Sequence, residues 1–256
     1  MSTFLNNEYF GLSVARGKQR NASHVNKFGF NDTVGTSFEV IAVGSANFVY
    51  PTSAGVVTIV SNDVVDTSAG TGARTVSIQG LDANYNVQGE TLITNGTSNV
   101  ATINTYIRLF RMSVETAGSG GASAGIITAS IGGNEQARID PEFDNQTLQA
   151  AYTVPAGHKA YLLRMQATST KDNKSAMVGL FTRSGVADAV FTVKQLVEVY
   201  RNNVSIDFPI PLEIDEKTDI ELRGKNLDTG NVSIGGAFDL LLVKDNTFTE
   251  HPDATG

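Results

Sequence analysis

The sequence predicts an all-β protein with two tandem antiparallel β-sandwiches and an extended N-terminal arm. Short segments that alternate apolar and polar residues recur along the chain, and no long segment shows the period of an amphipathic helix. Turn-forming Gly, Asn and Asp residues separate these segments at short, regular spacing, as in sandwiches. The long crossovers that parallel strands require are not evident, so we expect the sheets to be antiparallel.

The first sandwich is expected over residues 34–139. Residues 74–78 alternate strictly, residues 80–86 are rich in turn formers, and residues 90–94 supply a partner strand, which together predict a hairpin. A longer strand follows, and its apolar phase slips by one residue around Phe110. Such a slip predicts a β-bulge at this position.

The second sandwich is expected over residues 140–247, where the chain becomes more charged. Alternation continues at residues 161–167 and at residues 220–223. Many short strands with such connections favour a jelly roll for this half. The last strand, residues 232–243, contains Gly235-Gly236, which we interpret as a bulge or bend.

Residues 1–33 differ from the rest, because they are polar and carry four basic residues against Glu8 and Asp32. Such a segment buries too little apolar surface to order itself, so we expect it to be an arm held by a neighbouring subunit. Its removal should leave the body folded and abolish assembly. Residues 248–256 are expected to form a C-terminal tail. The expected partner-binding residues of the arm are Arg16, Lys18, Arg20, Lys27, Phe28 and Phe30.

Composition excludes several classes of site. The chain has no Cys, and its three His residues are far apart, so neither a disulfide nor a zinc site is expected. The net charge of -7 argues against extensive nucleic-acid binding. No apolar run is long enough to span a membrane, and no signal peptide is expected. We expect no cofactor and no metal.

Two clusters of polar residues are candidate ligand-binding sites. Residues 82–86 resemble the start of a calcium loop but lack its later Gly and Glu, so a hairpin turn is the favoured interpretation. An acidic cluster could hold a metal or a glycan, but a solvated corner between two strands is favoured. No catalytic elbow or paired carboxylates in an apolar pocket are evident, so we expect no enzyme. The acidic cluster consists of Glu213, Asp215, Glu216, Asp219 and Glu221.

Four stretches carry a resemblance to a known group of proteins. They are residues 74–92 (RTVSIQGLDANYNVQGETL), 152–162 (YTVPAGHKAYL), 208–223 (FPIPLEIDEKTDIELR) and 24–29 (HVNKFG). Together they resemble virion structural proteins of tailed bacteriophages, especially phages of marine bacteria. The resemblance implies a non-enzymatic particle component built from β-sandwiches, with no catalytic residues to transfer. It also implies partners among capsid, neck or tail subunits.

We therefore expect a capsid decoration or cement protein, or a neck- or tail-associated protein, that assembles through its arm and sandwich surfaces. It would be made and assembled in the host cytoplasm, reside in the virion and form a homo-oligomer there. The alternative is a host-surface or carbohydrate-binding adhesin module of a tail or fibre, which exposed Tyr residues over a groove would favour. A polysaccharide-degrading enzyme would instead show a cleft with carboxylates about 5–10 Å apart. The sequence leaves the position in the particle and the copy number open.

Overall fold

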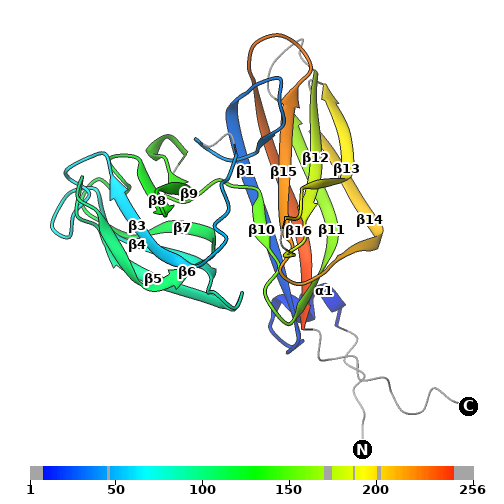
Figure 1. Cartoon of the computed structure of the whole chain (residues 1–256), viewed down its shortest axis with the longest axis horizontal. Coiled ribbons are helices and arrows are strands. Elements are labelled where there is room, and N and C mark those ends of the chain that lie inside the picture. The colour runs from blue at the N-terminus through cyan, green and yellow to red at the C-terminus, as the bar shows by residue number, and fades with distance from the viewer. Residues whose placement is uncertain are drawn as a thin grey trace, which may run out of the picture.

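The computed structural model describes residues 8–44, 47–143, 145–169, 175–186, 188–200 and 203–244. It is nearly all β, with 61% strand and 4% helix, which confirms the predicted fold class (Figure 1). Every strand pair among the described residues is antiparallel. Residues 1–7 of the expected arm and the whole expected tail, residues 248–256, lie outside the described residues.

The larger sandwich packs two sheets against each other. One sheet has the order β1 (Ala22–Val34), β16 (Val232–Lys244), β11 (His158–Ser169) and β14 (Asn203–Ile214). The other has the order β10 (Ala151–Thr153), β15 (Asp219–Asn226), β12 (Ser175–Arg183) and β13 (Thr192–Tyr200). The short strand β2 (Glu39–Val40) also pairs with β15.

This strand order is that of a jelly roll. The first strand, β1, pairs with the last, β16; moving inward along the chain, β10 pairs with β15, β11 with β14 and β12 with β13. These four nested pairs are those of one long antiparallel hairpin that has been rolled into two sheets. The jelly roll predicted for the second half is therefore present, and it includes a strand from the N-terminal segment.

The smaller sandwich is inserted between β2 and β10 of the jelly roll. Its first sheet has the order β6 (Val100–Tyr106), β3 (Gly55–Ser61), β8 (Ile127–Ile131) and β9 (Asn134–Ile139). Its second sheet has the order β5 (Val87–Ile93), β4 (Ala73–Leu81) and β7 (Arg108–Ala117). A single 3-10 turn, η1 (Pro141–Phe143), follows β9. The chain thus leaves the jelly roll once and returns to it, so the predicted tandem arrangement of the two sandwiches is wrong.

The prediction of a separate arm over residues 1–33 is wrong for residues 22–33. These residues belong to β1, which pairs with β16 from Ala22–Val243 to Val34–Val232. Between the apolar inward positions Val25 and Val34, β1 places Lys27, Gly29 and Asn31 inward, and all three are buried. Because these positions are not apolar, the strand lacks the alternation that marks the other strands. Among the described residues of the expected arm, residues 8–21, which include the helix α1 (Phe10–Ala15), lie outside the sheet.

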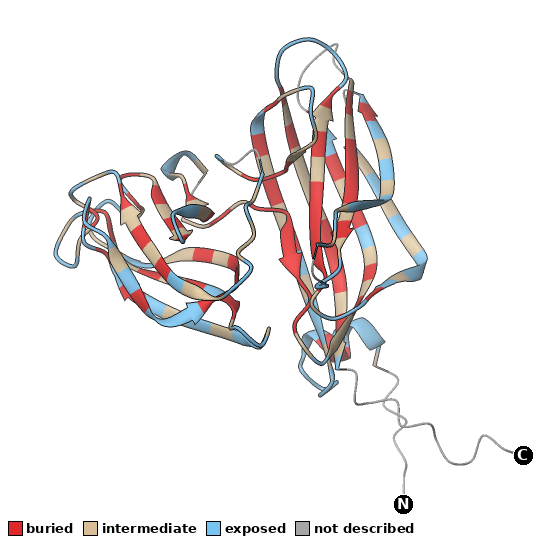
Figure 2. Cartoon of the chain, in the orientation of Figure 1, coloured by how far each residue is buried: buried red, intermediate tan, exposed pale blue. Residues whose placement is uncertain are grey.

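Each sandwich has its own apolar core, and buried positions alternate along the strands of both (Figure 2). The jelly-roll core includes Leu162, Leu180, Leu222 and Phe238, one from each of four strands. It also takes in three residues of the inserted sandwich, Leu81, Ile107 and Phe110. The core of the jelly roll therefore continues into the contact between the sandwiches.

The bulge predicted at Phe110 is confirmed, because Gln79 pairs with Arg111 while Gly80 pairs with Leu109. The bulge predicted at Gly235-Gly236 is wrong, since β16 keeps a regular register with β1 there. A Cβ on Gly236 would lie 2.9 Å from Ile41 Cδ1 and 3.0 Å from Leu222 Cδ1. Gly236 therefore allows close packing of the two sheets.

Candidate functional site

The structure does not gather the six predicted arm residues into one surface. Arg16 and Lys18 both pair with Glu8 of their own segment. Arg20 is exposed beside an apolar groove, whereas Lys27 is buried and donates a hydrogen bond to the carbonyl oxygen of Phe110. Phe28 and Phe30 are half-buried on β1, and the Phe30 ring lies 5.3 Å from that of Phe143. Their contact with a neighbouring subunit stays a prediction.

A buried ion pair joins the two sandwiches. Arg108, the first residue of β7, donates from Nε to Asp219 Oδ1 at 2.7 Å and from Nη2 to Asp219 Oδ2 at 3.1 Å. Asp219 begins β15 of the jelly roll and is 1% exposed. Burial alone would lower the pKa of Arg108, but the hydrogen bonds and charge of Asp219 outweigh it and raise that pKa. The guanidinium therefore stays charged across the junction.

Asp219 has further partners within the jelly roll. Thr153 Oγ1 donates to it at 2.6 Å, and Arg183 Nε donates at 3.0 Å. Arg108 also donates from Nη1 to the carbonyl oxygen of Pro51 at 3.0 Å. Each charged group is thus hydrogen-bonded on several sides, which is the condition under which buried charges are tolerated.

A second buried carboxylate, Glu221, lies two residues along β15. Tyr50 donates to its Oε1 at 2.6 Å, and Arg223 Nε donates to its Oε2. Burial raises the pKa of Glu221, although Arg223 and Tyr50 act against this. The pKa of Tyr50 is raised well above its usual value by burial and by the charges of Glu221 and Asp219. The guanidinium carbons of Arg108 and Arg183 lie 4.6 and 4.4 Å from the centre of the Tyr50 ring.

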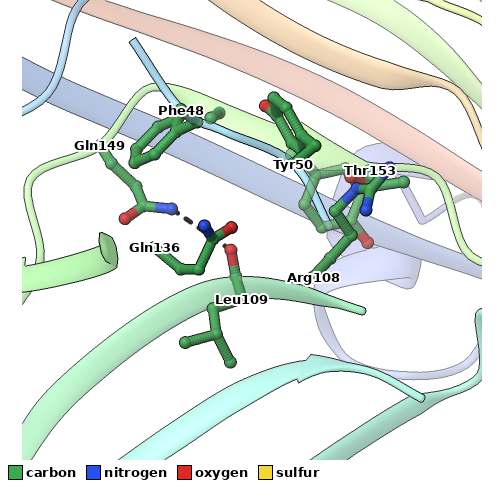
Figure 3. A pocket seen from close by; sticks show the side chains of 9 residues that line it. Phe48, Tyr50, Arg108, Leu109, Gln136, Gln149 and Thr153 are labelled. Carbon is green, nitrogen blue, oxygen red and sulfur yellow. Dashed lines mark hydrogen bonds between the residues drawn. The ribbon is translucent and has the colours of Figure 1, made fainter. Parts of the chain in front are cut away.

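The space beside this network is almost filled. A cavity of about 10 Å³, drawn in Figure 3, is lined by residues of both sandwiches. It has room for roughly one water molecule and none for a substrate. Gln149 donates to the carbonyl oxygen of Leu109 at 3.3 Å across the same contact. The junction therefore fixes the sandwiches together and offers no reaction chamber.

The solvated corner predicted for the acidic cluster is correct for three residues and wrong for two. Glu213, Asp215 and Glu216 are exposed, and Glu213 pairs with Lys159. Asp219 and Glu221 are buried, since they alternate with Ile220 and Leu222 and so face the inserted sandwich. The alternation was a visible signal, but Arg108, which pairs with Asp219, is 111 residues away in sequence. The turn predicted at residues 82–86 is confirmed, with Asp82 Oδ1 accepting from the backbone of Asn84 and Asn86.

Within the described ranges, no group of three or more His, Asp or Glu side chains could hold a metal ion. The same part of the chain contains no helix with the length and apolar character needed to cross a membrane.

An apolar surface lies at the end of the jelly roll near α1. A groove of about 570 Å³ is lined by Phe10, Tyr161 and Pro211 together with Leu241 and Val243 of β16. Tyr9, Phe10 and Leu12 are 80%, 55% and 49% exposed beside it. We call the set of Tyr9, Phe10, Leu12, Tyr161, Ile210, Pro211, Leu241 and Val243 the end surface.

Ile210 is presented by a bulge in an edge strand. Arg164 of β11 pairs with Asp207, and Leu162 pairs with Leu212, so the intervening residues of β14 leave the ladder. Pro209 and Pro211 flank Ile210, which is 88% exposed. Proline cannot donate to a ladder, so this edge is protected against strand addition while it displays an apolar side chain.

No protein-family model matches the chain, and no curated protein matches it. Among solved structures, a structure of the infectious bursal disease virus Gt strain has 9% identity and a TM-score of 0.25, covering 92% of this chain and 78% of that chain. A crystal structure of the infectious bursal disease virus VP2 subviral particle has 9% identity and a TM-score of 0.21, covering 90% and 74%. At these TM-scores the likeness carries no argument, and the jelly roll rests on the strand pairing above.

Proposed function

We propose that this chain is a structural subunit of a tailed-phage virion, either a capsid decoration or cement protein or a neck- or tail-associated protein. It acts by binding copies of itself and other virion proteins, not by catalysis. The single observation that carries the proposal is the end surface, an apolar face displayed on a rigid jelly roll. The sequence resemblance to tailed-phage virion proteins supports the same function.

The end surface has the composition of an interface. Isolated exposed apolar residues are ordinary, but a contiguous apolar groove with protruding aromatic and aliphatic side chains indicates a binding site. Its aromatic residues, Tyr9, Phe10 and Tyr161, belong to the residue types that dominate binding energy when buried. Arg20 at the rim of the groove supplies a cation that can pair with a carboxylate of the next subunit.

The junction supports a mechanical role. Arg108 and Asp219 fix the inserted sandwich to the jelly roll. The charged groups of the junction pair with one another, so they are not available to bind a ligand. A subunit that carries load between neighbours needs its domains to move as one body. The buried network provides this without a disulfide, which the chain cannot form.

The test uses two exposed residues of the end surface, so that folding is not disturbed. In the variant Phe10→Ser/Ile210→Ser, we expect incorporation into particles to fall at least about 100-fold, because two buried apolar side chains contribute about 1.5–3 kcal/mol each. Ile103→Ser is the matched control, since Ile103 is 92% exposed on β6 of the inserted sandwich. Normal incorporation of the double variant would exclude the end surface as the assembly site.

A further inference from the structure

A cleft lies between β1 and the inserted sandwich. β1 lies on the side of the jelly roll that faces that sandwich (Figure 1). Its volume is about 430 Å³. β1 contributes His24, Asn26 and Lys27, and the inserted sandwich contributes Gln79 and Arg111. The cleft is therefore built by both domains, and the junction described above fixes its width.

The cleft contains cations and no carboxylate. None of the residues that line it is Asp or Glu, in a chain with 26 acidic residues. Among the described residues, neither Lys27 nor Arg111 has a carboxylate partner within 4.0 Å. His24 and Asn26 differ, because both contact Asp239 of β16: His24 Nε2 lies 3.0 Å from Asp239 Oδ1, and Asn26 Nδ2 donates to the same oxygen at 2.9 Å.

Lys27 carries the argument, because a buried ammonium is costly without a counter-charge. It is 5% exposed, and the one hydrogen bond of its Nζ goes to the carbonyl oxygen of Phe110. An ammonium has three donors, so two are free to meet a ligand in the cleft. Burial and the nearby charge of Arg111 lower the pKa of Lys27 to about 7, which is the response expected of a cation that lacks an anion.

We propose that this cleft is an anion-binding site, in which Lys27 and Arg111 bind a carboxylate or a phosphate-like group and Gln79 supplies a further hydrogen bond. Arg111 offers a planar fork for two oxygens, and Lys27 offers a compact charge, so the pair suits a group with several oxygens. Two ligands have this chemistry: a free anion, and an acidic side chain of a neighbouring subunit.

The first experiment uses inorganic sulfate, which keeps its charge across the pH range. Thermal unfolding of the full chain is followed at pH 6.5 with increasing sodium sulfate, against sodium chloride at matched ionic strength. We expect the unfolding midpoint of the wild type to rise more steeply in sulfate than in chloride, and to follow the logarithm of the sulfate concentration once the site is filled. Sulfate also stabilises proteins in general, but that effect is the same in all variants, so the difference between wild type and variant reports binding at the site.

Variants separate the site from that general effect. We expect Arg111→Gln to weaken saturable sulfate binding about tenfold or more, and Lys27→Met to abolish it. Lys194→Gln is the control, because Lys194 is exposed on β13, outside the cleft. Binding should also weaken at pH 9, where Lys27 is neutral. The groups that face it are His24 on β1, Arg111 on β7 and Tyr152 on β10.

A second experiment identifies the source of the anion. If sulfate releases copies of the wild-type chain from one another in sedimentation velocity, and Arg111→Gln does the same without sulfate, the anion is a side chain of a neighbouring subunit. If sulfate binds without changing the sedimentation coefficient, the cleft takes a free anion. The proposal is overturned if the unfolding midpoints of the wild type and of Arg111→Gln respond equally to sulfate. Because Arg111 is only half-buried, this variant keeps the test valid even if Lys27→Met does not fold.

Discussion

Arg108 of the inserted sandwich and Asp219 of the jelly roll form a two-pronged, buried ion pair, with nitrogen–oxygen distances of 2.7 and 3.1 Å. The pair joins strands β7 and β15, which belong to different sheets and different sandwiches. It fixes how the two domains sit relative to each other, and therefore the shape of every surface that both domains build.

Replacing Arg108 with Met should destabilise the protein by about 3 kcal/mol, because it leaves the Asp219 carboxylate buried with fewer partners. Urea denaturation with a separate probe for each sandwich measures the effect. The matched control is Arg138→Gln, since the Arg138–Glu135 pair is partly exposed and should contribute only about 0–1 kcal/mol. Equal losses of unfolding free energy in the two variants would mean that the junction pair stabilises the protein no more than an exposed ion pair does.

Replacing Gly29 with Ala should unfold the jelly roll or expel β1. A Cβ at this position would lie 2.0 Å from the carbonyl oxygen of Ile41 and 2.5 Å from the backbone nitrogen of Ala150, and neither atom can move without breaking a sheet. Gly157→Asn is the control, because Gly157 has φ +68° with open space around it, a conformation that Asn tolerates. Circular dichroism melting of both variants decides; a Gly29→Ala protein as stable as the control would show that β1 is not held in this position.

Deletions should divide the N-terminal segment at residue 21. Removing residues 2–20 should leave cooperative unfolding intact, since β1 begins at Ala22. Removing residues 2–34 should abolish it, because β16 would lose its partner on one side and the core would lose Val34. This replaces our sequence-based expectation that an arm up to residue 30 could be deleted without loss of the body. Limited proteolysis of the two proteins is the measurement.

Lys27 should give the protein a pH dependence of stability. Its pKa is about 7 in the folded state against an ordinary value of 10.5, so between these values the unfolded chain binds the additional proton. Stability should therefore rise with pH by up to about 1.4 kcal/mol per unit from pH 7 to 9. The slope should be smaller in Lys27→Met and unchanged in Lys194→Met. Identical slopes in all three proteins would exclude a buried, titrating Lys27.

The sequence predicted those elements whose inward residues are apolar. Alternation along β4, β11 and β15 and the phase slip at Phe110 each correspond to the strands and the bulge observed. β1 was missed as a strand because its middle inward positions carry Lys27, Gly29 and Asn31. Their burial depends on contacts with residues far away in sequence. Lys27 donates a hydrogen bond to the carbonyl oxygen of Phe110, and Gly29 packs against the backbone of Ala150.

The candidate sites were harder to predict, because they are assembled between domains. The burial of Asp219 depends on Arg108, and the cleft depends on Lys27 and Arg111, which come from different sandwiches. The local pattern of apolar and polar residues contains no information on which residues from different sandwiches come into contact. The insertion of one sandwich into the other follows from the pairing of β1 with β16, the most distant contact in the chain's strand order.

The most direct test of the central claim is quantitative mass spectrometry of particles purified from a lysate of the host that makes this chain. We expect the chain at a fixed copy number relative to the major capsid protein, and that number distinguishes capsid decoration from a neck or tail position. Complete, infectious particles that contain no copies of the chain, with all of it left in the soluble fraction, would contradict the account.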